Sequence, residues 1–125
     1  MTGYEAKIAY SSKELTAKER IKMKDTGDAV RLDEATRDGS LLIDPDYYVI
    51  LAVHNEKAVD NKDYEQLIIT DKDGTKYVTG SQAFTDSFQM IWDEMADSGE
   101  DFQIKVYRVP SKNYSGKDFL TCSIE

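Results

Sequence analysis

Cysteine, histidine and proline are nearly absent from this sequence, and each scarcity excludes a class of protein. Cys122 is the single cysteine, which rules out an intramolecular disulfide. His54 is the single histidine, so a zinc site of the usual Cys/His kind is also ruled out, and we expect neither a metal nor a cofactor. With only two prolines and an ordinary apolar fraction, the chain does not read as disordered or fibrous.

Long hydrophobic runs are missing too. No apolar run approaches the roughly 20 residues that a membrane-spanning helix needs. The N-terminal stretch MTGYEAKIAY has no secretory hydrophobic region. We therefore expect a cytoplasmic protein with no membrane partner. By length, the 125 residues form a single domain.

Basic residues are few compared with acidic ones. The chain has 16 Lys and Arg against 24 Asp and Glu, a net charge of −8. This balance argues against a nucleic-acid partner, because nonspecific affinity comes from neutralising phosphates with Lys and Arg. The charge is sorted, however: acidic residues crowd 25–46, 56–73 and 86–101, whereas basic residues gather in the last quarter. A basic face on an acidic body remains compatible with nucleic-acid binding, although solvated surface lysines are the commoner explanation.

What is present is a clear change of hydrophobic period at Gly80-Ser81. Before it, residues 64–80 read as a hairpin, with Asp73-Gly74 as the positive-φ pair of a tight turn. After it, Ser81 is the expected N-cap of a helix of about four turns. One apolar stripe follows the helix and should pack on a sheet, with Trp92 in the core. The stripe consists of Phe84, Phe88, Ile91, Trp92 and Met95.

The remaining pattern is mostly that of strands. We expect strands at 47–54, 64–71, 75–80, 102–109 and 114–124, with the helix at 81–97. Upstream, residues 4–10 read as a weak strand or a loose arm, 25–39 as irregular, and 41–43 as a short strand. Thr16 and Glu19 have capping-box spacing, which slightly favours a helix over a strand at 17–24.

This order of elements favours one fold class. Three strands, a helix and two strands is the order of an OB-fold, a five-stranded, partly open Greek-key barrel, although an α+β sandwich fits as well. We therefore expect a mainly β fold with one main helix. It would be a single OB-fold-like domain over residues 1–125, with residues 1–40 as an N-terminal extension that packs on or flanks the barrel.

Catalytic motifs are missing. No nucleophile, base and orienting group can be assembled around a single histidine, so we expect no enzyme and no catalytic residue. Asp71, Asp73 and Gly74 resemble part of a calcium loop, but the bidentate glutamate at the twelfth position is absent. The glycines are scattered and form no phosphate-binding loop.

The polar side of the last two strands, with the turn between them, is the candidate binding site. Lysines alternate there with aromatic residues, as sequence-tolerant binding of single strands requires: rings stack on bases while ammonium groups follow phosphates. The alternative is that the aromatic residues simply cover core surface. The residues are Lys105, Tyr107, Lys112, Asn113, Tyr114, Lys117 and Phe119.

Three blocks resemble a known family. The block DGTKYVTGS with its following helix, the upstream VHNEK and the closing IKVYRVPSKNYSGKDFLTCSIE are similar to single-stranded DNA-binding proteins encoded by phages and prophages of Gram-positive bacteria. A fainter likeness extends to the replication proteins of this kind in small protein-primed podoviruses. The resemblance runs from residue 16 to residue 125.

The resemblance implies binding and protection of single-stranded DNA in phage replication or recombination, without catalysis. It places the protein in the cytoplasm of the bacterial host, with phage or host replication and recombination proteins as further partners. The matching motifs carry the DNA-binding role to Lys76, Tyr77, Lys105, Tyr107, Arg108, Lys112, Asn113, Lys117 and Phe119.

Two other functions fit the acidic charge. The first is a small acidic phage protein that binds and inhibits a host protein, as a mimic of DNA, through its acidic clusters. The second is an accessory domain in DNA metabolism that has no DNA affinity of its own. Titration with an oligonucleotide separates both from the DNA-binding hypothesis, which expects the terminal lysines to make the contact.

Overall fold

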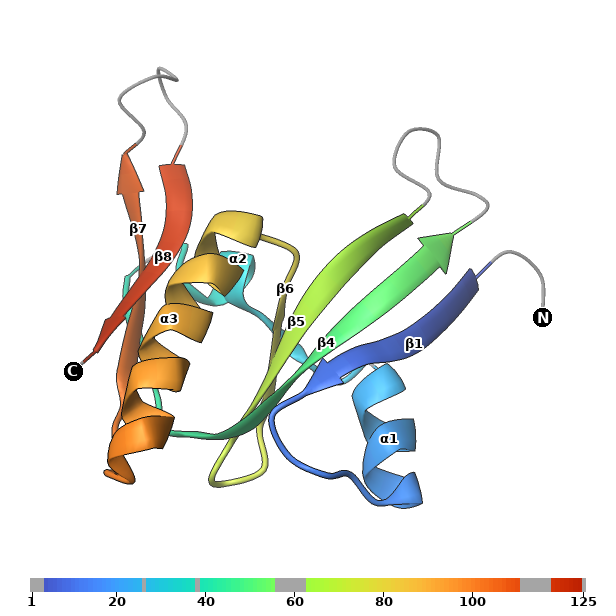
Figure 1. Ribbon diagram of the computed structural model, residues 1–125. Coiled ribbons are helices and arrows are strands. Elements are labelled where there is room, and N and C mark those ends of the chain that lie inside the picture. Colours follow the sequence, from blue (N-terminus) through green and yellow to red (C-terminus); the bar gives the residue numbers. More distant parts are fainter. Residues whose placement is uncertain (1–3, 26, 38, 56–62, 111–117, 125) are drawn as a thin grey trace. The chain divides into compact units, whose positions relative to one another are not determined.

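The computed structural model describes residues 4–25, 27–37, 39–55, 63–110 and 118–124 (Figure 1). The chain divides into two compact units, each built from separate stretches. Unit 1 comprises Met1–Val30 and Asp46–Gly80, and unit 2 comprises Arg31–Pro45 and Ser81–Glu125. The elements in chain order are β1 (Tyr4–Ser11), α1 (Ala17–Lys24), β2 (Val30–Arg31), α2 (Leu32–Ala35), β3 (Leu41–Ile43), β4 (Pro45–Asn55), β5 (Asp63–Asp71), β6 (Lys76–Thr79), α3 (Gln82–Ser98), β7 (Ile104–Pro110) and β8 (Asp118–Ile124).

Unit 1 is built on an open sheet of five strands in the order β1-β4-β5-β6-β2. Strand β1, the stretch that the sequence left between strand and loose arm, pairs antiparallel with β4 from Tyr4 to Ser11. Its register shifts between Ile8 and Tyr10. Apolar side chains of the sheet, of α1 and of the segment just before α1 form one buried cluster, which consists of Leu15, Met23, Tyr47, Val49, Leu51, Val53, Ile68 and Val78.

The predicted helix at 17–24 is confirmed as α1, and its capping box explains why helix prevails over strand. The backbone N–H of Glu19 donates to Thr16 Oγ1 at 3.2 Å, and the N–H of Thr16 donates to the Glu19 carboxylate at 3.0 Å. These bonds satisfy two N–H groups that a helix start otherwise leaves without a partner. Met23 then anchors the helix in the core of unit 1.

The hairpin between β5 and β6 differs from the predicted tight turn. Gly74 has φ 93°, but no non-glycine residue in the described part has a positive φ, so Asp73 does not belong to a positive-φ pair. The connection is a longer loop, 72–75, closed by the bond from Asp71 N–H to Thr75 O at 2.8 Å. The Asp73 carboxylate accepts from Thr75 N–H at 2.9 Å, which lowers the pKa of Asp73. A four-residue loop needs a left-handed conformation only at Gly74.

Unit 2 consists of the three-stranded antiparallel sheet β3-β7-β8 with α3 packed on one face (Figure 1). The helix starts where the sequence predicts it, because Ser81 Oγ accepts from Phe84 N–H at 3.2 Å. It ends at Gly99, which has φ 72° and donates its N–H to Met95 O. Phe84 and Phe88 stack with ring centroids 6.3 Å apart, and both are fully buried.

Trp92 lies less deeply than predicted. It is only half-buried, with its ring 6.0 Å from Phe88 and 5.8 Å from Phe102. A small sheet covers only the middle of the apolar stripe of a helix that packs on it, so residues at the margin of the stripe remain partly exposed to water. The tryptophan therefore borders the core of unit 2.

Residues 25–39 are not irregular throughout, as the sequence suggested. They contain the two-residue strand β2 and the one-turn helix α2. Leu32 is fully buried, as expected of an anchor, whereas Val30 is 37% exposed. The stretch is short of apolar residues, so the elements are too brief for periodicity to reveal them.

The fold class is confirmed in its coarser form: the protein is mostly strands with one long helix. The strands of the described part form two open sheets, of five and three strands, and no closed barrel. No helix among the described residues is long and apolar enough to cross a membrane.

Candidate functional site

Strand β7 presents two different faces, and this difference defines the candidate site. Ile104 and Val106 are fully buried on the face that α3 covers, whereas Lys105 between them is exposed. The register continues this division onto the neighbouring strands, since Lys105 pairs with Leu42 of β3 and with Ser123 of β8. The face with Lys105 is therefore the outer face of the sheet of unit 2.

An aromatic ring and a lysine lie together on this outer face. Lys105 Nζ is 5.9 Å from the centroid of the Tyr107 ring, at the outer limit of a cation–π contact. Leu42, 53% exposed, lies opposite Lys105, and Thr121 lies opposite Tyr107. The half-buried Tyr107 ring is therefore fixed by the sheet and still reachable from solvent.

Arg108, the next residue, is held by the fold on the other side of β7. Its Nε donates to Thr36 Oγ1 at 3.2 Å, and its Nη2 donates to the backbone carbonyl of Asp33. Thr36 Oγ1 donates in turn to Leu32 O at 2.8 Å. This chain of hydrogen bonds ties the guanidinium to α2 and orients it.

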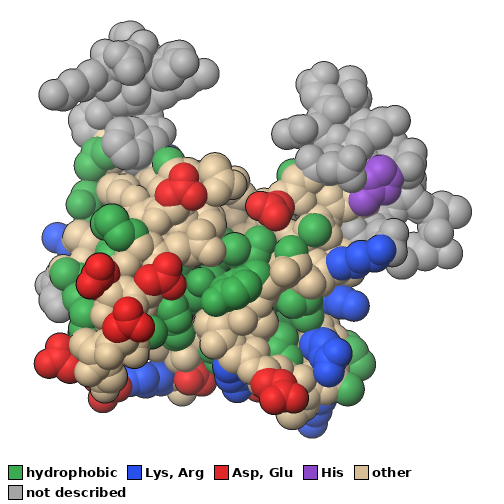
Figure 2. All heavy atoms as spheres, in the orientation of Figure 1, with side chains coloured by type: hydrophobic (Ala, Val, Ile, Leu, Met, Phe, Trp, Pro, Cys, Tyr) green, Lys and Arg blue, Asp and Glu red, His purple; other side chains and the backbone are tan. Residues whose placement is uncertain are grey.

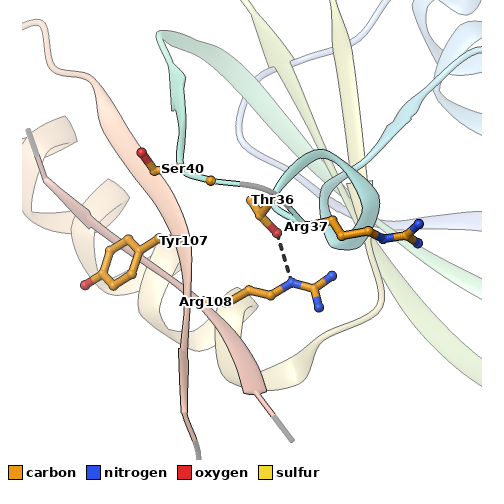
Figure 3. A pocket seen from close by; sticks show the side chains of 6 residues that line it. Thr36, Arg37, Ser40, Tyr107 and Arg108 are labelled. Atoms are coloured by element: carbon orange, nitrogen blue, oxygen red, sulfur yellow. Dashed lines mark hydrogen bonds between the residues drawn. The ribbon is translucent and has the colours of Figure 1, made fainter.

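A pocket opens where β3 leaves β7. Pairing between them ends with Leu41 opposite Val106, and beyond that point β7 borders a pocket instead of a strand. The pocket has a volume of about 320 Å³, within the range of small-molecule sites. Figure 3 shows Arg37 and Arg108 extending to the same side, away from Tyr107. The lining residues are Thr36, Arg37, Gly39, Ser40, Tyr107 and Arg108.

The pocket and the outer face together suit an anionic, aromatic ligand. Two guanidinium groups favour phosphate oxygens, which they bind with several donors at once. The exposed Ser40 adds a hydroxyl that can form hydrogen bonds, and Tyr107 adds a ring surface on which a base can stack. Lys105 lies beside that ring.

Lys76, the lysine of the GTKY motif, lies in unit 1 and is already occupied. Its Nζ donates to Lys22 O at 2.8 Å and to Asp25 O at 2.7 Å, and pairs with Asp28 Oδ1 at 2.7 Å. The hydrogen bond from Lys76 holds the pKa of Asp28 below its usual range. Only 10% of the Lys76 side chain is exposed. Its ammonium group binds backbone carbonyls at the C-terminal end of α1 and so stabilises that end.

Tyr77 follows Lys76 in β6, paired with Ile69 of β5. It is half-buried, and this burial raises the pKa of the Tyr77 phenol, with a smaller contribution from Asp71 and Asp73. Lys76 and Tyr77 belong to unit 1, whereas Lys105, Tyr107 and Arg108 belong to unit 2. Of the predicted residues whose side chains the structure describes, it brings together only the last three.

Five predicted residues cannot be placed in this way. Lys112, Asn113, Tyr114 and Lys117 lie outside the described residues. The backbone of Phe119 pairs with Val109 in the ladder between β7 and β8, and its side chain is not among those described.

Sequence reasoning missed the residues that complete the pocket from the other side. Arg37 lies in the stretch 25–39 that the sequence suggested to be irregular, which carries more acidic than basic residues, and Ser40 follows directly after it. The one available signal was the predicted strand at 41–43. Arg37 and Ser40 must lie close to the strand that pairs with residues 41–43. The local sequence pattern does not show which strand that is.

Comparison with protein-family models, with curated proteins and with solved structures gives no match to this chain. Within the described ranges, no group of three His, Cys, Asp or Glu side chains is placed to hold a metal ion.

Proposed function

We propose that this protein binds single-stranded DNA with little regard to base sequence and protects it during phage replication or recombination. The observation that carries the proposal is the outer face of β7, where an exposed lysine lies over a tyrosine ring beside a pocket lined by two arginines. Stacking on an aromatic ring tolerates any base, and cationic side chains follow the phosphates. The activity is binding, without catalysis.

The arginine-lined pocket supports a phosphate at the edge of the sheet. Arg108 is preoriented by Thr36 and the Asp33 carbonyl, so little side-chain entropy is lost when it takes a ligand. Arg37 is exposed and lies on the same pocket. Tyr107 and the two arginines line one pocket, and in this proposal a base stacks on the ring while the arginines bind a backbone phosphate.

The path of the chain supports the OB-fold-like barrel as the finer form of the fold. A single residue, Asp44, separates β3 from β4, so one stretch of chain serves both sheets. Strands that pass from one sheet to another make the corners of orthogonal sandwiches and small barrels. The order from β4 to β8 is also that of the OB-fold, whose surface commonly binds oligonucleotides.

Titration of a fluorescently labelled oligonucleotide at two salt concentrations tests the proposal. We expect binding of the single strand in preference to the duplex, with an affinity that falls as salt rises. The variant to compare with the parent protein is Arg37→Ala, which removes an exposed side chain of the pocket. It should weaken DNA binding without changing the stability of the fold. No binding at low salt would overturn the proposal.

One observation favours a second function, inhibition of a host protein by mimicry of DNA. Helix α3 contains no basic residue, and its exposed acidic side chains follow one face of the helix (Figure 2). They are Asp86, Asp93, Glu94 and Asp97. A protein that acts in this way would bind no DNA, so the same titration separates the two functions. In either case we place the protein in the cytoplasm of a bacterial host, and replication or recombination proteins are its expected partners.

A further inference from the structure

Helix α3 and the end of strand β8 form an exposed apolar groove. Met90 is 66% exposed and Ile124, at the end of β8, is 49% exposed. Together with Ile91, Met95 and the rim residue Glu94 they line a hollow of about 240 Å³. Isolated exposed apolar residues are ordinary, but here several of them form one shallow, almost wholly apolar site.

Acidic residues surround this groove on the helix. Relative to Met90, Asp86 lies four positions before, Asp93 three after and Glu94 four after, which are the helix positions next to it. Asp97 follows one turn beyond Asp93, and all four acidic residues are exposed. The helix thus presents an apolar centre with a negative rim.

Helix α1 presents the opposite arrangement. Ile21 is 70% exposed, the highest value among the large apolar residues of the described part. Lys18 lies three positions before it and Lys24 three after, and both are exposed. Arg20 and Lys22 add further positive charge, so Lys and Arg side chains gather over β1 and α1 (Figure 2). Asp25, four positions after Ile21 at the C-cap, is exposed and acidic, so the helix presents an apolar centre with a mostly positive rim.

We propose that α1 of one copy of this chain docks on the groove of α3 in a second copy, with Ile21 seated beside Met90 and Ile124. The lysines around Ile21 then face the acidic residues around Met90. Because the two surfaces differ, the contact is heterologous, and a pair of copies keeps one unused α1 surface on one copy and one unused α3 groove on the other. The protein therefore associates head to tail in rows or rings.

Charge and shape together favour a second copy over nucleic acid as the occupant. A phosphate backbone matches the lysines of α1 but offers no apolar seat for Ile21, and it is repelled by the acidic rim of α3. A second copy matches both surfaces at once. This association does not rest on the proposed DNA binding, and it is measured without DNA.

Sedimentation equilibrium of the full chain at low and high salt tests the proposal. We expect the average mass to rise with protein concentration at low salt and to fall towards the monomer at high salt, because the rims attract through screened charges. A mass that stays at the monomer at every concentration in low salt would overturn it.

Two charge-reversed variants make the test specific. Lys18→Glu with Lys24→Glu reverses the rim of α1, and Asp93→Lys with Asp97→Lys reverses the rim of α3. Each variant alone should associate about tenfold more weakly or worse, because like charges then meet. An equimolar mixture should recover association, since the reversed α1 fits the reversed α3.

Circular dichroism first establishes that both variants fold. The exposed residue Ile21 gives a second test that leaves all charges unchanged: Ile21→Ser should also weaken association. If the mixture stays as weak as its components, the two helices do not meet. If the α1 variant associates like the parent but loses affinity for an oligonucleotide, α1 is a nucleic-acid surface instead. Either result overturns the proposal.

Discussion

Strands β6 and β7 each carry a lysine close to a tyrosine, yet the two lysines lie in different surroundings. Lys76 is almost covered and bonds to two carbonyls and a carboxylate of its own unit. Lys105 is exposed and lies over the Tyr107 ring. One sequence pattern thus serves the fold in β6 and a surface in β7. The difference indicates that a lysine close to an aromatic residue is available to a ligand only where its ammonium group is not needed inside the protein.

The largest expected effect tests the structural half of this comparison. Lys76→Met should lower the free energy of unfolding by about 2–3 kcal/mol, because charge-assisted hydrogen bonds of a covered side chain are lost and their acceptors are left without a partner. Urea unfolding at neutral pH measures it. The control is Lys105→Met, which should change stability by less than about 0.5 kcal/mol, as exposed positions do. Equal stability of the two variants would contradict the structural role of Lys76.

Tyr107→Ala tests the binding half. A stacked base contributes about 1–3 kcal/mol, so affinity for single-stranded DNA should fall about tenfold to a hundredfold, with little change in its salt dependence. Fluorescence titration measures both quantities. Tyr107→Phe keeps the ring and should bind as the parent does. If the alanine variant also binds as the parent does while folded, the outer face of β7 is not the site.

A smaller effect is expected for Lys105→Ala. Loss of one phosphate contact should reduce the slope of log affinity against log salt by about 0.7, the value for a single strand. The affinity itself should fall only a few-fold at moderate salt. Lys76→Met, assayed where it is fully folded, should leave the slope unchanged. A slope that responds to Lys76 and not to Lys105 would reverse the roles of the two strands.

Cys122 lies on the buried face of the sheet of unit 2, opposite to the face that carries Lys105. Burial raises the pKa of Cys122 from its ordinary value near 9.0 to about 12, so the thiolate fraction at pH 8 falls roughly a thousandfold. Cys122 should therefore react slowly with a disulfide reagent until the protein unfolds. Because the folded-state pKa is raised, this group's contribution to stability is complete below pH 9 and is lost as the pH rises towards 12. Fast labelling of the native protein would place Cys122 on the exposed face.

Local pattern predicted much of the fold, and contacts between distant segments explain what it missed. Ser81 and Gly99 bound α3 because capping depends on neighbouring residues, and Thr16 bounds α1 for the same reason. Trp92 was placed too deeply because periodicity gives the direction of a side chain and not the depth of the surface it meets.

The site was predicted in the same uneven way. Lys105 and Tyr107 follow from alternation along a strand, which is local. The occupation of Lys76 by the end of α1 depends on residues about fifty positions away, and the pocket depends on where β3 leaves β7. Neither contact can be predicted from the residues next to it in the sequence. Arg37 was therefore missed in the pocket, and Lys76 was interpreted as a surface residue.

The interrupted course of the chain through the two units has a consequence for its synthesis. Strand β3 belongs to unit 2, but its partner β7 is translated only after all of β4, β5, β6 and α3. The Leu41–Ile43 segment therefore leaves the ribosome as an apolar strand with no sheet to join. Unpaired strand edges of this kind promote aggregation of growing chains. Unit 2 is complete only once β8 has been made, so truncation before β8 removes the pairing partner of β7 as well as the missing segment itself.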